Sequence, residues 1–256
     1  MTQIIDGKEI ASHLRERIAQ VTIASELTPG LATVLVGDNP ASLSYVAGKQ
    51  RACEHSGFHA EDVRLPSTTS QNELETRIAE LNSRNDIHGI LVQQPLPDHL
   101  DTEAIVACVA PDKDVDGFHP ENLGALMRGA PAFWPCTPFG IVQLLAESEI
   151  AVAGRHVVIV GRSLLVGKPL ALLLLRKASL ESGNGRLNAG CDATVTVCHS
   201  RTKNLSEVTR GADILVAAMG RPESITGDMV REAAVIIDVG INRVEDSSRK
   251  RGYRLV

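Results

Sequence analysis

A buried-strand pattern followed by a glycine turn limits the fold of this chain more than any other feature. Val157 to Val160 is a continuous apolar run, and Gly161 follows it directly. Gly167 and Pro169 then precede a second apolar run, Leu170 to Leu175, which has helical composition. A strand, a tight turn and a helix in this order present backbone N–H groups to a phosphate in α/β domains. The sequence therefore predicts a parallel α/β domain with a nucleotide site.

Strand and helix patterns alternate along the whole chain. Gly7 to Ala24 has apolar residues at helical spacing, while Leu31 to Val36 and His88 to Gln93 are short apolar runs typical of buried strands. Ser70, with Glu73 three residues on, is the capping-box pattern of a helix start. Four strand-like runs follow in the second half: Val157 to Val160, Thr194 to Cys198, Ile214 to Ala218 and Val235 to Asp238. This alternation predicts parallel sheets built from βαβ units.

A proline-rich segment, Pro135 to Pro138, divides the chain into two predicted domains. Thr137 is suited to cap a helix that runs from Pro138 to about Ser148. The 256 residues also exceed the usual size of a single domain. We therefore expect an α/β fold of two βαβ-type domains, residues 1–135 and residues 136–256, with a cleft between them.

The composition argues against several classes of function. A net charge of -5 and a pI near 5.9, with scattered Lys and Arg, give no reason to expect a nucleic-acid partner. No apolar run approaches the roughly 18 residues that a membrane span requires. The five cysteines form no C-x-x-C pair and the N-terminus lacks a basic and apolar leader, so we expect a cytoplasmic protein with reduced thiols. Gly57 interrupts the metal-like spacing of His55 and His59, and we expect no metal site.

The turn at Gly161 departs from the G-x-G-x-x-G motif, because the next glycine is Gly167. On the turn alone, a phosphate site and an ordinary βα turn that binds nothing are equally good interpretations. The segment Cys198 to Lys203 offers hydroxyls and cations where NAD-preferring sites place a carboxylate. Arg162 adds a planar guanidinium that suits phosphate oxygens. We therefore predict NADP in preference to NAD, although each cation taken singly is also consistent with a solvated loop residue.

Tyr45 and Lys49 form a Y-x-x-x-K pattern on a predicted helix, which places their side chains one turn apart on the same face. A tyrosine and a lysine in this arrangement can move protons. For the lysine to act as a base near neutral pH, its pKa must fall by roughly 3 units from about 10.4, which requires an enclosed or positively charged site. The alternative is a surface helix on which the spacing occurs by chance. Short-chain reductases also use Y-x-x-x-K, but after their nucleotide fold rather than before it.

Three further residues stand at structural breaks. Gln93 ends a buried run, and prolines two and four residues later fix how the chain leaves the sheet, so its amide is suited to recognition. Asp116 precedes a glycine, where it either presents a carboxylate to an amino-substituted heterocycle or makes an Asx turn. Cys136 has no neighbouring base in sequence and is expected to pack at the linker rather than act as a nucleophile.

Several motifs, taken together and in order, carry a family resemblance. They are Ser44-Tyr45-x-x-x-Lys49, Gly89-Ile90-Leu91-Val92-Gln93, Pro95-Leu96-Pro97, Lys113-Asp114-Val115-Asp116-Gly117-Phe118, Pro135-Cys136-Thr137-Pro138, Gly161-Arg162-Ser163 with Val166-Gly167-Lys168-Pro169, and Asp238-Val239-Gly240-Ile241-Asn242. Over nearly the whole chain they closely resemble the bifunctional methylenetetrahydrofolate dehydrogenase/methenyltetrahydrofolate cyclohydrolase family.

The resemblance implies two reactions in one-carbon metabolism, on tetrahydrofolate derivatives. The first is oxidation of 5,10-methylenetetrahydrofolate by NADP, and the second is hydrolysis of the 5,10-methenyl product to 10-formyltetrahydrofolate. It also implies an N-terminal folate-binding catalytic domain, a C-terminal Rossmann-like NADP-binding domain, a homodimer, and a link to purine biosynthesis. Two alternatives stay open: a monofunctional dehydrogenase, and a non-enzymatic NADP-binding module with an incomplete folate site.

The same resemblance implies a role for each candidate residue. Lys49 handles protons as water adds to the cationic methenyl carbon, Tyr45 positions the pterin and Lys49, and Gln93 orients Lys49 and the substrate. Asp116 accepts hydrogen bonds from the amino-pyrimidine part of the pterin. The implied cofactor-binding residues are Gly161, Arg162, Ser163, Ser200, Gly220, Gly240 and Ile241.

The sequence departs from the family pattern in two places of interest. The pattern continues past Val256 with a proline- and glycine-rich turn and a final helix that returns to the folate domain, and this chain stops before that segment. We expect truncation; the alternative is a folate site that lacks one wall. The glycine-rich stretch Ser182 to Gly190 is also longer than the usual connection, and it is expected to be a surface loop.

Overall fold

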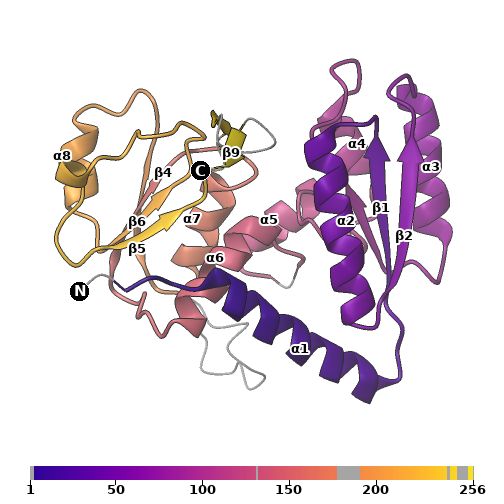
Figure 1. Cartoon of the computed structure of the whole chain (residues 1–256), viewed down its shortest axis with the longest axis horizontal. Helices are drawn as coiled ribbons and strands as arrows, with labels where there is room; N and C mark the ends of the chain where they lie inside the picture. Colours follow the sequence, from indigo (N-terminus) through magenta and orange to yellow (C-terminus); the bar gives the residue numbers. More distant parts are fainter. Residues whose placement is uncertain (1–2, 131, 178–190, 241–242, 247–252, 256) are drawn as a thin grey trace. The chain divides into compact units, whose positions relative to one another are not determined.

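The computed structural model describes residues 3–130, 132–177, 191–240, 243–246 and 253–255. The chain divides into two compact units, Met1–Cys136 and Thr137–Val256, each with a parallel sheet of its own (Figure 1). The boundary expected from the proline-rich segment lies one residue earlier. The predicted α/β class is confirmed, because helices alternate with parallel strands in both units.

The first unit contains a three-stranded parallel sheet in the order β2-β1-β3. Figure 1 shows β1 and β2 running in the same direction, with α2 and α3 beside them. Its elements are α1 Gly7–Ser25, β1 Gly30–Val36, α2 Pro40–His55, β2 His59–Leu65, α3 Gln71–Ser83, β3 Gly89–Val92, α4 Thr102–Cys108 and α5 Pro120–Arg128.

The central strand β1 contributes Ala32, Val34 and Val36 to a hydrophobic core of the first unit. All residues of β1 except Leu31 are buried, as expected for a parallel strand that is covered on both faces. The same core includes fully buried residues of α3 and α4, among them Leu74, Ile78 and Ile105. The capping box predicted at the start of α3 is confirmed: Ser70 N donates to Glu73 Oε2 at 2.8 Å, and Glu73 N donates to Ser70 Oγ at 3.3 Å.

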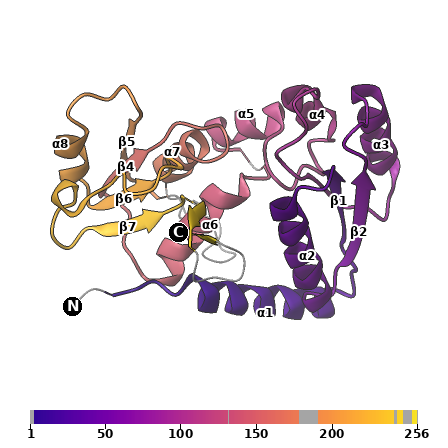
Figure 2. The same cartoon turned by 45° about the horizontal axis from the view of Figure 1, so that its top comes forward.

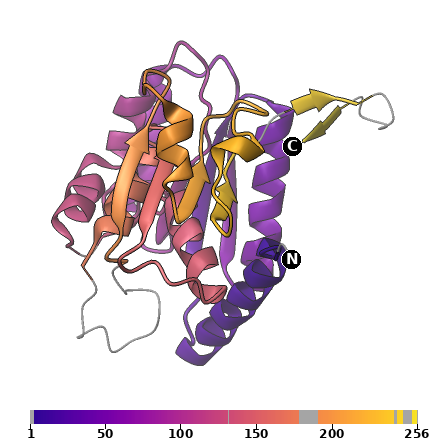
Figure 3. The ribbon, with the colours of Figure 1, turned by 90° about the vertical axis from the view of Figure 1, so that its left-hand side faces the viewer.

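The second unit contains a four-stranded parallel sheet in the order β5-β4-β6-β7, whose strands lie side by side in Figure 2. Its elements are α6 Cys136–Glu147, β4 His156–Val160, α7 Gly167–Leu175, β5 Thr194–Cys198, α8 Leu205–Arg210, β6 Ile214–Ala217, the 3-10 turn η2 Gly227–Met229, β7 Val235–Asp238, β8 Arg243–Glu245 and β9 Tyr253–Leu255. Strands β8 and β9 pair antiparallel and are the two short arrows near the C-terminus in Figure 3.

The start of α6 corrects one expectation. Thr137 was expected to cap a helix beginning at Pro138, but α6 already begins at Cys136. Pro138 is therefore the third residue of the helix. A proline is tolerated there because the first N–H groups of a helix have no intrahelical acceptor. The predicted loop Ser182 to Gly190 lies outside the described residues.

Candidate active site

A lysine and a glutamine meet at the edge of the first sheet. Gln93 follows β3 directly, and its backbone N donates to Val34 O at 2.8 Å, which continues the ladder beyond the strand. Its side-chain Nε2 donates to Gln94 O at 2.7 Å. That bond fixes the amide so that Oε1 accepts from Lys49 Nζ of α2 at 3.0 Å. Lys49 is therefore held by an uncharged acceptor.

Burial is the main influence on the Lys49 amine. It lowers the pKa of Lys49 below its usual value, because an ammonium group loses solvation when it is enclosed. The Asp116 carboxylate opposes this shift by attracting the charged form, and burial still prevails. Lys49 is thus partly buried, with a lowered pKa, as a proton-transferring lysine would require.

The loop that carries Asp116 is held by a different carboxylate, Asp114. Asp114 is buried and accepts hydrogen bonds from Gly117 N at 3.1 Å, His119 N at 2.7 Å and Asn122 Nδ2 at 2.9 Å. The Asx-type turn that sequence offered for Asp116 is thus made by Asp114. The backbone donors of the turn therefore go to Asp114, while the Asp116 carboxylate interacts with Cys136 and Lys49.

Glycine is required next to Asp116. Gly117 has a φ of +70°, and a Cβ at this position would collide with the backbone of Trp134. Both the left-handed conformation and the close approach exclude larger residues. The sharp bend at Gly117 therefore depends on this residue type.

Asp116, Lys49 and Cys136 interact electrostatically. Burial raises the pKa of Asp116, while the Lys49 charge and a hydrogen bond with Cys136 lower it. Burial and the Asp116 carboxylate together raise the pKa of Cys136 to about 12. The Cys136 thiol is therefore neutral at ordinary pH, and its single hydrogen has two acceptors within reach, the Asp116 carboxylate and Val115 O, the latter at 3.3 Å from Sγ. The sequence neighbours of Cys136 gave no sign that it lies beside Asp116.

Tyr45 lies one turn before Lys49 on α2, and its side chain is half exposed. Among the described residues it makes no hydrogen bond to Lys49, so the structure does not join the two as a proton-transfer pair. The exposed ring is open to a ligand instead.

The turns after β4 and β5, which are predicted to bind the cofactor, are joined by a backbone hydrogen bond. Val160 of β4 pairs with Cys198 of β5, and Gly161 N donates to Cys198 O at 2.9 Å. Gly161 has a φ of +145°, and a Cβ there would collide with Ala218 O beyond β6. Glycine is thus needed for three turns to approach closely. Arg162 and Ser200, the next residues of two of these turns, are both exposed.

Ser163 organises the start of α7. Its Oγ accepts from Val166 N at 3.1 Å and from Gly167 N at 3.4 Å, and its carbonyl oxygen accepts from Lys168 N at 3.1 Å. The hydroxyl hydrogen remains able to donate to an anion. Ser163 therefore shapes the turn, in addition to any contact with a ligand.

The remaining cofactor candidates follow the other strands of the second sheet. Gly220 comes after β6 and is exposed, with a φ of +60°. Gly240 comes after β7, and its N donates to Asp238 Oδ1 at 2.9 Å. Ile241 lies outside the described residues. The described candidates thus share the carboxyl edge of one parallel sheet, where such sheets bind ligands.

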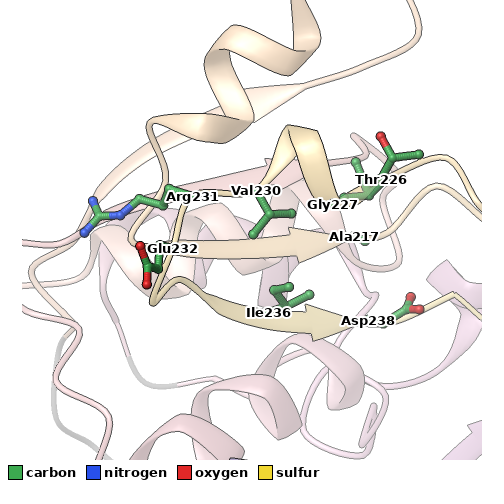
Figure 4. A pocket seen from close by; sticks show the side chains of 9 residues that line it. Ala217, Thr226, Gly227, Val230, Arg231, Glu232, Ile236 and Asp238 are labelled. Atoms are coloured by element: carbon green, nitrogen blue, oxygen red, sulfur yellow. The ribbon is translucent and has the colours of Figure 1, made fainter. Parts of the chain in front are cut away.

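A cavity of about 570 Å³ lies beside β7 (Figure 4). Ala217, Val230 and Ile236 form its apolar part, with Arg231 near one end and Asp238 at the other. It contains none of the predicted site residues, whereas a much smaller cavity of about 10 Å³ in the first unit is lined in part by Asp116.

Two classes of site find no support in the part of the chain that the structure describes. No group of three or more His, Cys, Asp or Glu side chains is arranged to hold a metal ion there. No helix within that part is long and apolar enough to cross a bilayer.

Two family models match the chain. One, described as the catalytic domain of tetrahydrofolate dehydrogenase/cyclohydrolase, matches residues 5–116. The other, described as the NAD(P)-binding domain of tetrahydrofolate dehydrogenase/cyclohydrolase, matches residues 135–254. Between them the two models account for most of both units.

Known proteins show the same similarity. A relative from Chlorobium phaeobacteroides, named bifunctional protein FolD, is 48% identical over 99% of this chain and 84% of its own length. The solved bifunctional FolD enzyme from Campylobacter jejuni is 41% identical, with a TM-score of 0.87 over 99% of this chain and 84% of its own. The FolD enzyme from Trypanosoma brucei, solved with NADP and an inhibitor, is 36% identical, with a TM-score of 0.83 over 98% of this chain and 81% of its own.

Proposed function

The chain belongs to the tetrahydrofolate dehydrogenase/cyclohydrolase family and is a bifunctional enzyme that uses NADP, and we propose that Lys49 transfers the protons of its hydrolytic step. The observation that carries this assignment is the hydrogen bond of the partly buried Lys49 amine to Gln93 Oε1 at 3.0 Å. A neutral amine that donates one hydrogen to an amide oxygen keeps its lone pair for another proton.

The hydrolysis is balanced by one water molecule. Its oxygen bonds to the cationic methenyl carbon, and Lys49 accepts the proton that the water loses. The bond from that carbon to N5 then breaks, N5 takes a proton from the Lys49 ammonium, and the second water proton leaves as 10-formyltetrahydrofolate forms. A base with a lowered pKa suits this sequence, because it accepts and returns a proton near neutral pH.

We propose that Asp116 recognises the substrate. An aminopyrimidine presents N–H donors that a carboxylate accepts with charge-assisted hydrogen bonds. The backbone N–H groups of Gly117 and His119 donate to the Asp114 carboxylate, so they do not bond to the Asp116 oxygens. The half-exposed Tyr45 ring on α2 is proposed to position the pterin.

The cofactor residues of the second unit fit a dinucleotide phosphate. Exposed Arg162 and Ser200 offer a cation and a hydroxyl on turns that the Gly161–Cys198 bond holds together. Gly220 and Gly240 leave the main chain after β6 and β7 open to close approach, and Ile241 is proposed to contribute beside Gly240. NADP, when bound, accepts the hydride of methylenetetrahydrofolate. These residues bind and orient it, and the hydride step needs no protein base.

Assaying both reactions over a range of pH tests the proposal. The chain should reduce NADP in the presence of methylenetetrahydrofolate and should accelerate the decay of methenyltetrahydrofolate. The cyclohydrolase rate should rise with pH as Lys49 loses its proton, and the lowered pKa of Lys49 moves this rise towards neutral pH. The dehydrogenase rate should not show this rise with pH, because hydride transfer does not require Lys49 as a base. A chain that reduces NADP without accelerating methenyl decay would be a monofunctional dehydrogenase.

We further propose that the enzyme is a cytoplasmic homodimer whose product supplies purine biosynthesis. All five cysteines are free, which agrees with a reducing compartment. The dimer rests on family resemblance, and sedimentation equilibrium of the purified chain should give twice the 27.4 kDa chain mass. A mass of one chain at micromolar concentration would contradict the proposed homodimer.

A further inference from the structure

We infer that His199 is a positioning residue for cofactor selectivity: it holds the turn after β5 so that Ser200 and Arg201 face the 2′-phosphate of NADP. This inference rests on the proposed cofactor site, and it adds a residue that does not itself touch the ligand.

Three hydrogen bonds close the turn around His199. The His199 ring accepts at Nδ1 from Arg201 N at 3.1 Å. The backbone N of His199 donates to Thr202 Oγ1 at 2.9 Å, and Thr202 N donates back to His199 O at 2.8 Å. Ser200 and Arg201 are left at the tip of this turn, and both are exposed.

The place of the turn in the sheet makes these bonds important. β5 is an edge strand, as the order β5-β4-β6-β7 in Figure 2 shows, so its turn has a neighbouring strand on one side only. The bond from Gly161 N to Cys198 O anchors the base of the turn to the Arg162 turn. Beyond Cys198, the described bonds that define the tip come from His199 and Thr202.

The hydrogen bond from Arg201 N requires one tautomer of the His199 ring. A backbone N–H can bond to Nδ1 only when that nitrogen carries no hydrogen, so the proton of the neutral ring lies on Nε2. An asparagine has an acceptor oxygen at the position equivalent to Nδ1. A leucine fills similar space but offers no acceptor, and it leaves Arg201 N without its partner.

Calorimetric affinities for NADP and NAD test the inference. In His199→Leu, the Kd for NADP should rise about 3- to 10-fold, as expected for one lost neutral hydrogen bond, while the Kd for NAD stays unchanged. His199→Asn should stay within about twofold of the parent protein for both cofactors. His13→Leu, the same change at an exposed histidine of α1, is the matched control.

The outcomes separate this inference from the site on which it rests. Equal weakening of NADP and NAD in His199→Leu, or no weakening, overturns it. Ser200→Ala and Arg162→Ala should both weaken NADP; if neither does, the proposed cofactor site itself is wrong. If His199→Leu does not fold, His199→Gln carries the comparison, because its amide lies one carbon further from the backbone.

Discussion

The Lys49→Met variant is expected to lose cyclohydrolase activity by about 10²- to 10⁴-fold, the usual contribution of a general acid–base residue. Methionine has nearly the length of lysine and can occupy the same enclosed space without an amine. Hydride transfer requires no protein base, so measurable dehydrogenase activity should remain. The measurement is the decay of added methenyltetrahydrofolate, corrected for the rate without protein.

Lys8→Met is the matched control, because Lys8 is an exposed lysine in the first turn of α1. It should leave both rates unchanged. Cyclohydrolase activity that survives in Lys49→Met would contradict the role of Lys49. Loss of both activities with a lowered unfolding temperature would instead show that the amine is needed for the fold.

The Asp116→Asn variant is expected to raise the KM for methylenetetrahydrofolate by about 10- to 100-fold. Hydrogen bonds to a charged group contribute about 1.5–3 kcal/mol, which corresponds to that range. The Kd for NADP, measured by calorimetry, should not change. An unchanged KM for methylenetetrahydrofolate would contradict the proposed role of Asp116 in substrate recognition.

The same variant has a second readout in the pH profile. The Asp116 carboxylate raises the pKa of Lys49, in opposition to burial. Removal of the carboxylate therefore leaves burial unopposed, and the pKa of Lys49 falls further. The residual cyclohydrolase rate should then begin to rise at a lower pH than in the parent protein. A shift to higher pH would contradict this electrostatic coupling.

Asp114→Ala distinguishes binding from folding. Asp114 is buried with three donors, so its removal should lower the free energy of unfolding by about 3 kcal/mol. Asp112→Ala, at an exposed neighbouring position, should change it by less than about 0.5 kcal/mol. Urea unfolding gives both values. Asp116→Asn should resemble the Asp112 variant in stability.

Sequence predicted the features that depend on short-range patterns. The strand before Gln93 and the capping box at Ser70 both follow from residues a few positions apart. The turn at Gly161 was placed correctly for the same reason, although the approach of Ala218 that explains the glycine could not be seen.

Features that depend on distant neighbours were not predictable. Asp114 and Asp116 are both carboxylates in one short motif, and the three hydrogen bonds that Asp114 accepts, one of them from the Asn122 side chain on α5, show which is structural. Cys136 reaches Val115 across 21 positions of sequence, so no local pattern could have linked it to Asp116. The helices α4 and α5 are short, with seven and nine residues, and they were not predicted from the sequence.

The cluster of Lys49, Gln93, Asp116 and Cys136 lies entirely within the first unit, Met1–Cys136. If these residues carry the hydrolysis as proposed, mutations in the first unit alone can change that reaction, and mutations in the second unit can change cofactor preference. Relatives that have lost only the cyclohydrolase activity should then carry the inactivating changes in the first unit.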